Sequence, residues 1–407
     1  MPEKAQPEQT TPSTYAEAGV DEVREQTAFG RVMRPWLART QVKSPMVTSI
    51  TGLSSGYFAT LMHLPPGPPL ALTTDGVGTK ILLARQANRW EPIGIDCVAN
   101  NVNDLICVGA VPLALLDYIA TDRIDEAVLD EVARGLFLGS ELAGIAIPGG
   151  EIAQIGAMLA DSTGGGPMLD LVGTAIGALP PAAGALPPAA GALPPAADAQ
   201  SAAQSGRAAA GNGYRKPLDG SAVAPGDVII GLPSSGLHSN GYSLARHALF
   251  AKGGMALSDQ VPVTGRRLVD ALLQPTRVYV QAAEALWAAG VVPHGMAHIS
   301  GGGLLNIARL AANVSYELDT LAPAPEIFAL IADRGQIDAA TMYATFNMGI
   351  GFCVVVAESD LQVALDTLKR AGEDAIRIGR VTAKPGKFVS IPSEGLEGRG
   401  DAFEHVG

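Results

Sequence analysis

Cysteine is scarce in this 407-residue sequence, and its three copies, Cys97, Cys107 and Cys353, form no Cys-x-x-Cys pair. An odd number of widely spaced cysteines supports neither a disulfide framework nor a zinc site. No apolar run is long enough to cross a bilayer, and the first residues lack the apolar segment of a signal peptide. We therefore expect a cytoplasmic protein without a membrane partner.

Basic and aromatic residues are also few. The chain has 28 lysines and arginines against 40 acidic residues, a net charge of −12. Such a chain lacks the broad basic face that nucleic-acid binding requires, so any phosphate must be bound locally by backbone amides, metal ions or a few placed cations. Aromatic residues are 5% of the chain and hydrophobic residues 47%, which predicts an aliphatic core.

One long segment lacks the periodicity of a helix or a strand. The heptapeptide Gly-Ala-Leu-Pro-Pro-Ala-Ala occurs three times between Gly177 and Ala197, and small residues then dominate to Gly213. Paired prolines exclude a continuous helix, so we expect an extended linker, either a tolerated expansion or an arm that docks a partner. The predicted layout is a disordered tail (1–14), an N-terminal domain (15–177), the linker (178–215), a C-terminal domain (216–390) and a second tail (391–407).

The sequence on both sides of the linker mixes short aliphatic runs with helical patterns. Asp125 precedes one such pattern and is placed to cap a helix. Strands are expected at 70–73, 114–118, 145–147, 227–232 and 352–357. Helices are expected at 93–108, 125–143, 242–250, 304–311 and 361–371, with a stretch at 268–289 that is interrupted near Pro275. This mixture predicts a pair of α/β or α+β domains.

The run Thr74-Asp75-Gly76-Val77-Gly78-Thr79-Lys80 follows the first expected strand. Its two glycines permit close approach to a ligand, and Thr79 and Lys80 supply a hydroxyl and a cation, the ingredients of a phosphate-binding loop. The spacing is not that of a Walker loop. Read alone, an Asp-Gly pair of this kind is more often a plain turn.

A polar row lies on the expected helix 93–108. Asp96, Asn100, Asn103 and Asp104 recur at i, i+4, i+7 and i+8, so they share one face of an otherwise apolar helix. Oxygen-bearing side chains in this arrangement suit a hard cation or a polar ligand. The alternative is a solvent-exposed polar stripe.

A third motif ends a β-branched run with Gly149-Gly150-Glu151. It repeats the order of the first motif: strand end, glycine, acid. Three carboxylates, from Asp75, Asp104 and Glu151, would form a magnesium site that also recruits nucleotide phosphates. The metal would supply the positive charge that this acidic chain lacks.

Two further motifs follow the linker. The stretch 234–244 contains His238, Ser239 and Asn240 between an expected strand and helix, where His238 is placed to act as an acid, a base or a phosphate donor. The alternative is a serine-rich turn that caps the helix. The triplet Gly301-Gly302-Gly303 precedes another expected helix and predicts either an anion site or a flexible joint.

Taken in order, these motifs resemble one family, phosphoribosylformylglycinamidine cyclo-ligase, also called aminoimidazole ribonucleotide synthetase. Tyr15–Asp21, Ala224–Asp227 and Gln274–Arg277 match the family as well. The resemblance runs from about residue 15 to about residue 381, apart from the linker. It implies a two-domain α/β (α+β) fold whose N-terminal sheet forms a barrel-like core across a homodimer, with the active site between the domains.

The resemblance also implies a function. The expected reaction is ATP-dependent closure of formylglycinamidine ribonucleotide to aminoimidazole ribonucleotide in purine biosynthesis, through phosphorylation of the formyl oxygen. ATP and Mg²⁺ are the expected cofactors, and a nucleotide is the expected small-molecule substrate. Such chemistry needs mainly positioning and charge stabilisation.

Carried over to this chain, the resemblance assigns roles to the motif residues. The expected metal ligands are Asp75, Asp104 and Glu151, and the expected catalytic residues are Lys80 and His238. ATP is expected to contact Gly76, Gly78, Thr79, Lys80, Asp96, Asn103, Gly149 and Gly150. The substrate is expected to contact Ser239, Asn240, Gly301, Gly302 and Gly303.

The chain departs from the family pattern at two points. Gly-Gly-Glu is followed by Ile152-Ala153-Gln154 where the family has Thr-Ala-Glu, and Ser54-Ser55 replaces the glycines of a Gly-Gly-Phe-Gly loop. These changes keep two alternatives open: another ATP-using member of the same superfamily, or a catalytically impaired nucleotide-binding homologue with the linker as its interaction arm.

Overall fold

The computed structural model describes residues 57–159, 167–182 and 213–406, together with short stretches between residues 31 and 53. The predicted tail 1–14, the 15–21 motif, Ser54-Ser55 and residues 183–212 of the predicted linker lie outside the described residues. Within the described residues, we find no helix that is both long enough and apolar enough to cross a membrane.

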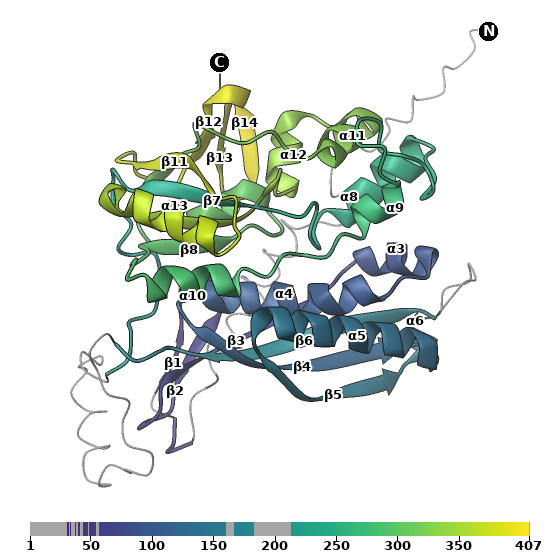
Figure 1. Cartoon of the computed structure of the whole chain (residues 1–407), viewed down its shortest axis with the longest axis horizontal. Helices are drawn as coiled ribbons and strands as arrows, with labels where there is room; N and C mark the ends of the chain where they lie inside the picture. The colour runs from purple at the N-terminus through teal and green to yellow at the C-terminus, as the bar shows by residue number, and fades with distance from the viewer. Residues whose placement is uncertain are drawn as a thin grey trace.

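The N-terminal half folds into a sheet with strand order β1-β2-β3-β6-β4-β5. Helices α4 and α5 cover one face of this sheet, and the opposite face carries no described helix (Figure 1). The strands are β1 (Ser49–Gly52), β2 (Thr60–His63), β3 (Pro69–Gly76), β4 (Val111–Thr121), β5 (Ala146–Gln154) and β6 (Leu169–Ala178). The helices are α3 (Lys80–Ala87), α4 (Glu91–Cys107), α5 (Glu126–Ala143) and α6 (Gly156–Leu159).

Strand register decides which face of this sheet each motif residue occupies. Asp75 pairs with Gly173, Gly173 pairs with Asp117, and Asp117 pairs with Gly150, so these four residues form one row across the sheet. A side chain built at Gly173 would meet Asn101 of α4, so this row faces the helices. Because neighbouring residues along a strand point to opposite faces, Glu151 lies on the uncovered face.

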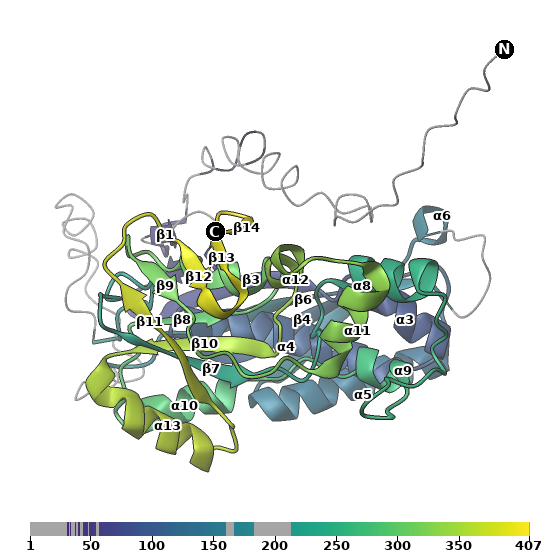
Figure 2. The same ribbon diagram turned by 90° about the horizontal axis from the view of Figure 1, so that it is seen from above.

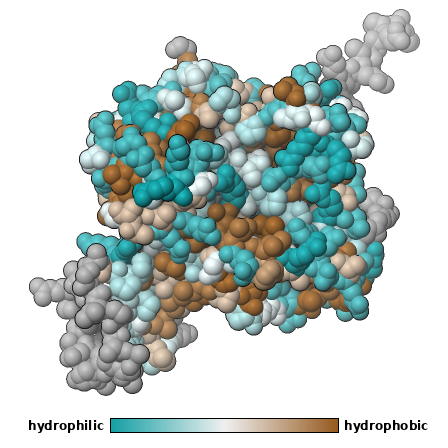
Figure 3. Space-filling model, viewed as in Figure 1, coloured by the Kyte–Doolittle hydropathy of each residue, from teal (hydrophilic) through white to brown (hydrophobic). Residues whose placement is uncertain are grey.

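The uncovered face of the N-terminal sheet is partly apolar. Leu116 and Tyr118 are 50% and 43% exposed on it. On the other side of the domain, α5 exposes Phe137 and Leu142. Apolar residues gather near the middle of the visible surface, where α5 and α10 lie (Figure 3).

The C-terminal half forms a second sheet with strand order β14-β13-β12-β9-β11-β7-β10-β8. This sheet lies over the helices of the N-terminal half when the molecule is seen from above (Figure 2). The strands are β7 (Val228–Pro233), β8 (Gly295–His298), β9 (Ser315–Glu317), β10 (Ile350–Val356), β11 (Ile376–Thr382), β12 (Val389–Ile391), β13 (Leu396–Arg399) and β14 (Ala402–His405). The helical elements are α8 (Tyr242–Arg246), η2 (His247–Lys252), α9 (Leu268–Leu272), α10 (Val280–Ala288), η3 (Gly303–Arg309), α11 (Glu326–Gly335), α12 (Ala339–Thr345), η4 (Glu358–Asp360), α13 (Leu361–Arg370) and η5 (Pro392–Glu394).

The two-domain α/β architecture is confirmed, and most expected elements are present. Asp125 caps α5 by accepting hydrogen bonds from the backbone amides of Ala127 and Val128. The expected helix 304–311 is instead the 3₁₀ helix η3, and the expected helix 242–250 changes from α to π geometry at His247. The exact domain boundaries and the tail assigned to residues 391–407 stay predictions. In that last range the structure contains the final residue of β12 together with β13 and β14.

The described ends of the predicted linker lie side by side. Pro181 and Tyr214 form an antiparallel bridge, and the amide of Ala182 donates to the carbonyl of Gly213 at 2.8 Å. The chain therefore leaves and re-enters the fold at one point. An insertion held at such a point can vary in length at small entropic cost.

Candidate active site

Helix α4 lies between the N-terminal sheet and the C-terminal domain and carries the predicted polar row into that interface. Asp96, Asn100 and Asn103 are buried, and Asp104 is partly buried. The structure therefore excludes the solvent-exposed stripe. Buried polar groups require partners, and the C-terminal domain supplies many of them.

Lys80 was expected at the nucleotide phosphates, but the structure gives it a different place. Its side chain is fully buried, and Nζ lies 2.7 Å from Asp96 Oδ2. Nζ also donates to the carbonyls of His238, at 3.0 Å, and Gln274, at 2.7 Å. An ammonium group has three donors, so this arrangement leaves none for a phosphate. In this structure Lys80 ties the two domains together.

Asp96 and Asn103 make the same kind of connection. Asp96 Oδ1 accepts hydrogen bonds from both the amide and the hydroxyl of Thr276, each at 2.7 Å. Asn103 donates to the carbonyl of Arg277 at 2.8 Å and accepts from the amide of Tyr279 at 2.9 Å. Both residues therefore hold the 276–279 segment of the C-terminal domain, and their expected contact with ATP stays a prediction.

Asp75 and Asp104 form an acidic corner beside this contact. Asp104 Oδ1 lies 2.9 Å from His298 Nδ1, which comes from the end of β8. The pKa of Asp75 is raised to about 6, first because neighbouring protein groups desolvate its carboxyl and second because of the charge of Asp104. Arg309 and His298 lower that pKa only in part. The ionised form of Asp75 is therefore poorly stabilised by its surroundings.

The third expected metal ligand is not in this corner. Glu151 lies in the edge strand β5, which β6 and β4 separate from β3. It is exposed on the uncovered face of the sheet, opposite to the face of Asp75. Among the residues that the structure describes, no three His, Cys, Asp or Glu side chains are grouped to hold a metal. The structure therefore does not bring Asp75, Asp104 and Glu151 together within one chain, and their joint role as metal ligands stays a prediction.

Gly149 and Gly150 lie inside β5 and not in a loop after it. A Cβ atom on Gly150 would stand 2.3 Å from a carboxylate oxygen of Asp117. A larger residue at this position would have to displace the Asp117 side chain. The expected ATP contact of these two glycines stays a prediction.

The loop at residues 76–79 has the glycine conformation that the sequence predicts. Gly78 has a φ of 72°, a left-handed conformation that favours glycine, and a Cβ there would meet nothing within 4 Å. Gly76 ends β3 next to Asp75. Thr79 is exposed, and its hydroxyl lies 3.2 Å from that of Ser243 in the other domain.

His238 is buried in the interface with a left-handed φ of 61°. Its Nε2 accepts a hydrogen bond from the amide of Ser235 at 3.2 Å, which leaves the proton of the neutral ring on Nδ1. Burial, followed by the charges of His298, Lys80 and Arg277, holds the pKa of His238 well below its usual range. His238 is therefore a neutral donor and not an acid at neutral pH.

The neighbours of His238 and the glycine triplet have structural contacts as well. Ser239 lies 3.0 Å from the hydroxyl of Thr276, and Asn240 follows it, half-buried. Gly302 and Gly303 are left-handed, and a Cβ on Gly303 would stand 2.2 Å from the carbonyl oxygen of Tyr343. Gly301 is half-buried beside them.

Several buried polar atoms around this site lack a partner, although buried polar groups are nearly always satisfied. They are Asn100 Oδ1, Asn101 Oδ1, His238 Nδ1 and His298 Nε2. Asn100 and Asn101 meanwhile donate to the carbonyls of Gly76 and Asp75, each at 3.2 Å. His238 Nδ1 and His298 Nε2 lie at the domain interface, whereas Asn101 faces the N-terminal sheet. Unpaired polar atoms at a domain interface are suited to a polar ligand.

Sequence reasoning missed two residues of this site. His298 opens the glycine-triplet motif, but its pairing with Asp104 joins positions 194 residues apart. Arg309 lies at the end of η3, where its guanidinium stands 4.9 Å from the ring centre of Phe58. No short motif marks Arg309.

The described residues next to Asp75 also border a cavity of about 320 Å³. It is lined by Tyr57, Phe58, Ala59, Thr60, Leu72, Thr73, Thr74 and Thr174. The hydroxyls of Thr74 and Thr174 lie 3.1 Å apart there. A volume of this size accommodates part of a nucleotide.

Comparisons with known proteins agree with this architecture. Family models described as AIR synthase related protein, N-terminal domain and C-terminal domain, match residues 57–179 and 224–392. Phosphoribosylformylglycinamidine cyclo-ligase from Methanothermobacter thermautotrophicus is 38% identical over 370 residues, covering 91% of this chain and 94% of that one. The enzyme of the same name from Myxococcus xanthus is 39% identical over 386 residues, with 93% and 99% covered.

A solved structure of the hydrogenase maturation protein HypE in complex with ATP has the same fold. Its TM-score is 0.53 at 17% sequence identity, and the match covers 97% of this chain and 98% of that chain.

Proposed function

This chain belongs to the phosphoribosylformylglycinamidine cyclo-ligase (AIR synthase) family, and we propose that it uses ATP to close formylglycinamidine ribonucleotide to aminoimidazole ribonucleotide. Identity of 38% over 91% of the chain supports this activity above the other ATP-using proteins of the fold. One structural observation carries it: Asp75, Asp104 and His298 converge at the domain interface, next to buried polar atoms without partners.

The chemistry requires little covalent participation by the protein. The γ-phosphoryl group of ATP passes to the formyl oxygen of the substrate, which turns that oxygen into part of a leaving group. A nitrogen of the same substrate then attacks the carbon, the carbon–oxygen bond breaks, and phosphate leaves with the loss of one proton. Positioning and charge stabilisation account for most of the catalysis of such a step.

Asp75 and Asp104 fit a magnesium ion that arrives with the nucleotide. Mg²⁺ commonly takes one or two carboxylates and completes its shell with water and substrate phosphates, so an all-protein cage is not required. Burial and, second, the charge of Asp104 raise the pKa of Asp75, and a bound divalent cation would stabilise its ionised form. When bound, the ion would neutralise phosphate charge during transfer.

His298 is placed to handle a proton. Asp104 accepts from its Nδ1, which orients the ring and leaves Nε2 buried and unpaired. A carboxylate–histidine pair of this kind suits removal of the proton from the attacking nitrogen. His238, neutral and with Nδ1 unpaired, would donate a hydrogen bond to the substrate.

We also infer a homodimer through the uncovered face of the N-terminal sheet. Leu116 and Tyr118 are each more than 40% exposed there, and such apolar faces on a sheet are usually covered. Leu116→Asp is expected to give a monomer in sedimentation velocity. Leu142→Asp, a change at an equally exposed position on α5, is the matched control. A monomeric wild-type protein would contradict the inference.

The activity is tested directly by incubating the purified protein with ATP, Mg²⁺ and formylglycinamidine ribonucleotide and measuring the aminoimidazole product. Asp104→Asn is expected to remove turnover, whereas Asp366→Asn, on the exposed side of α13, is expected to retain it. ATP binding without any product would favour the impaired homologue. No product and no rescue of a purine auxotroph that lacks this enzyme would refute the activity.

A further inference from the structure

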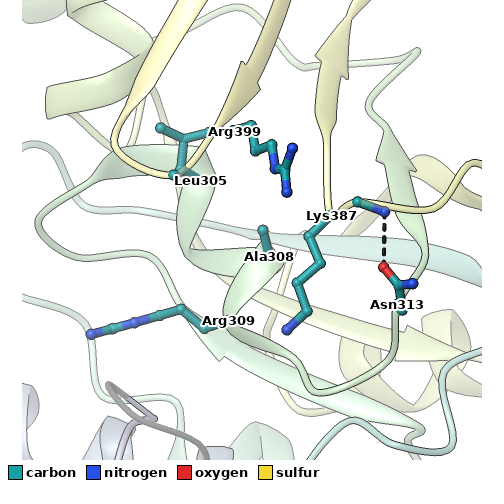
Figure 4. A pocket seen from close by; sticks show the side chains of 8 residues that line it. Leu305, Ala308, Arg309, Asn313, Lys387 and Arg399 are labelled. Atoms are coloured by element: carbon teal, nitrogen blue, oxygen red, sulfur yellow. Dashed lines mark hydrogen bonds between the residues drawn. The ribbon is translucent and has the colours of Figure 1, made fainter.

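A second pocket, of about 340 Å³, lies in the C-terminal domain between η3 and β13 (Figure 4). It is lined by Leu305, Ala308, Arg309, Asn313, Gly386, Lys387, Arg399 and Gly400. Three of these residues are cations and none is an acid. In a chain with a net charge of −12, this combination is unusual.

The pocket cations have no acidic partner within the part of the chain that the structure describes. The described ion pairs, by contrast, include Lys384 with Glu397 and Arg377 with Asp319, both close to the same strands. Arg399 and Lys387 reach toward the same space beside Ala308, whereas Arg309 extends away from it (Figure 4). Two cations thus converge on one cavity without compensation.

The turn that presents Lys387 is held in an uncommon conformation. Lys387 has a φ of 59°, in the left-handed region that side chains rarely adopt, and Gly386 before it has a φ of 105°. The amide of Gly386 donates to Asn313 Oδ1 at 2.9 Å, and that of Phe388 donates to Ser315 Oγ at 3.0 Å. Backbone strain that is stabilised in this way is concentrated at functional sites.

Lys387 is also fixed at its tip. Nζ donates to the carbonyl of Leu310 at 2.7 Å, which leaves two donors of the ammonium group for a ligand. The guanidinium of Arg399 stands over the ring of Phe388, 5.3 Å from its centre, and retains its planar set of donors. A fixed ammonium beside a guanidinium matches the charge and the several acceptors of a phosphate group.

We propose that this pocket binds a phosphate group through Lys387 and Arg399. The occupant is either free phosphate or the phosphate ester of a small sugar phosphate, because both present the same dianion. The pocket is connected to the active site through Arg309, which lies over Phe58 and acts on the charge of Asp75. The pocket is separate from the glycine triplet, because Gly303 begins η3 and Arg309 ends it, so that the length of η3 lies between them.

The test is isothermal titration of the metal-free full chain with inorganic phosphate, with chloride at equal ionic strength as the reference. Arg399→Gln and Lys387→Met are each expected to weaken phosphate binding about tenfold or more, the size of a lost charge-assisted contact. Lys384→Met removes a neighbouring lysine that is already paired with Glu397 and is expected to change nothing. Arg399 is exposed, so its variant is expected to fold, which circular dichroism verifies.

A second titration with ribose 5-phosphate separates the two sources. If ribose 5-phosphate binds and Arg399→Gln abolishes that binding, the pocket is assigned to a phosphate ester. If inorganic phosphate binds and ribose 5-phosphate does not, the pocket is assigned to free phosphate. The inference is overturned if phosphate binds no better than chloride, or if Lys384→Met weakens binding as much as Arg399→Gln. None of these measurements depends on turnover, so a failure here is distinct from a failure of the proposed activity.

Discussion

The substitution Lys80→Met tests whether this lysine is structural. The buried ammonium contacts Asp96 and two carbonyls, so its removal leaves a buried carboxylate whose remaining donors come from Thr276. Removing one partner of a buried ion pair costs about 3–5 kcal/mol, because the other charge stays uncompensated. We expect the free energy of unfolding to fall by about that amount.

The assay is urea unfolding of the full chain, followed by fluorescence and by circular dichroism, because a two-domain protein can unfold in more than one step. Lys252→Met is the matched control. Lys252 donates to one carbonyl, that of Gly335, at 2.7 Å, so its loss is expected to cost about 1 kcal/mol. Adding Asp96→Asn to Lys80→Met removes the buried charge while keeping an acceptor for Thr276, and it should recover part of the loss.

If Lys80 instead binds a phosphate of ATP, the effects on stability and on ATP binding are reversed. The Lys80→Met protein would then unfold like the wild type while its KM for ATP rises sharply. That result would refute the structural role, and the lysine would have to leave its buried position when ATP binds.

Three further predictions concern the acidic corner and the linker. Asp75→Asn is expected to abolish Mg²⁺-dependent turnover. In EDTA it is expected to raise the free energy of unfolding by about 1 kcal/mol at pH 8, after discounting for solvent exposure, and to have little effect near pH 4. The sign follows because folding raises the pKa of Asp75 from 3.8 to about 6, so the carboxyl destabilises the fold increasingly between these pH values and fully above them, and an equal effect at pH 4 and pH 8 would contradict it. His298→Gln is expected to lower kcat about 100-fold, whereas His294→Gln, which breaks a similar pair with Asp227 outside the site, should leave kcat unchanged; equal effects would remove His298 from catalysis. Deleting residues 184–197 is expected to leave kcat/KM nearly unchanged because the described ends of the insertion are already paired, and a large loss would make the linker functional.

Local patterns in the sequence were sufficient for most of the fold. The apolar run at 114–118 and the capped pattern from Asp125 both correspond to observed elements, because periodicity and capping depend on residues a few positions apart. The polar row of Asp96 to Asp104 was also placed on one helix face correctly. The 3₁₀ geometry of η3 was missed because a short apolar run does not distinguish a 3₁₀ helix from an α-helix.

The candidate site was predictable only as a set of motifs. The order of the motifs identified the family, and Asp75 and Asp104 were correctly expected near each other, as the charge of Asp104 acting on Asp75 indicates. The contribution of His298 was not predictable, because its partner Asp104 lies on another domain. Nothing local distinguishes a histidine that meets a carboxylate from one that packs in a core.

The sequence by itself therefore determined the family, the two α/β halves and the positions of the polar motifs. Only the tertiary structure decided which motif residues meet. Glu151 is directed away from Asp75 because strand alternation and strand order place them on opposite faces and three strands apart. Lys80 is directed into the interface because Asp96 and two carbonyls of the other domain provide acceptors for all of its donors there. Both outcomes depend on contacts between distant segments, which no short motif specifies.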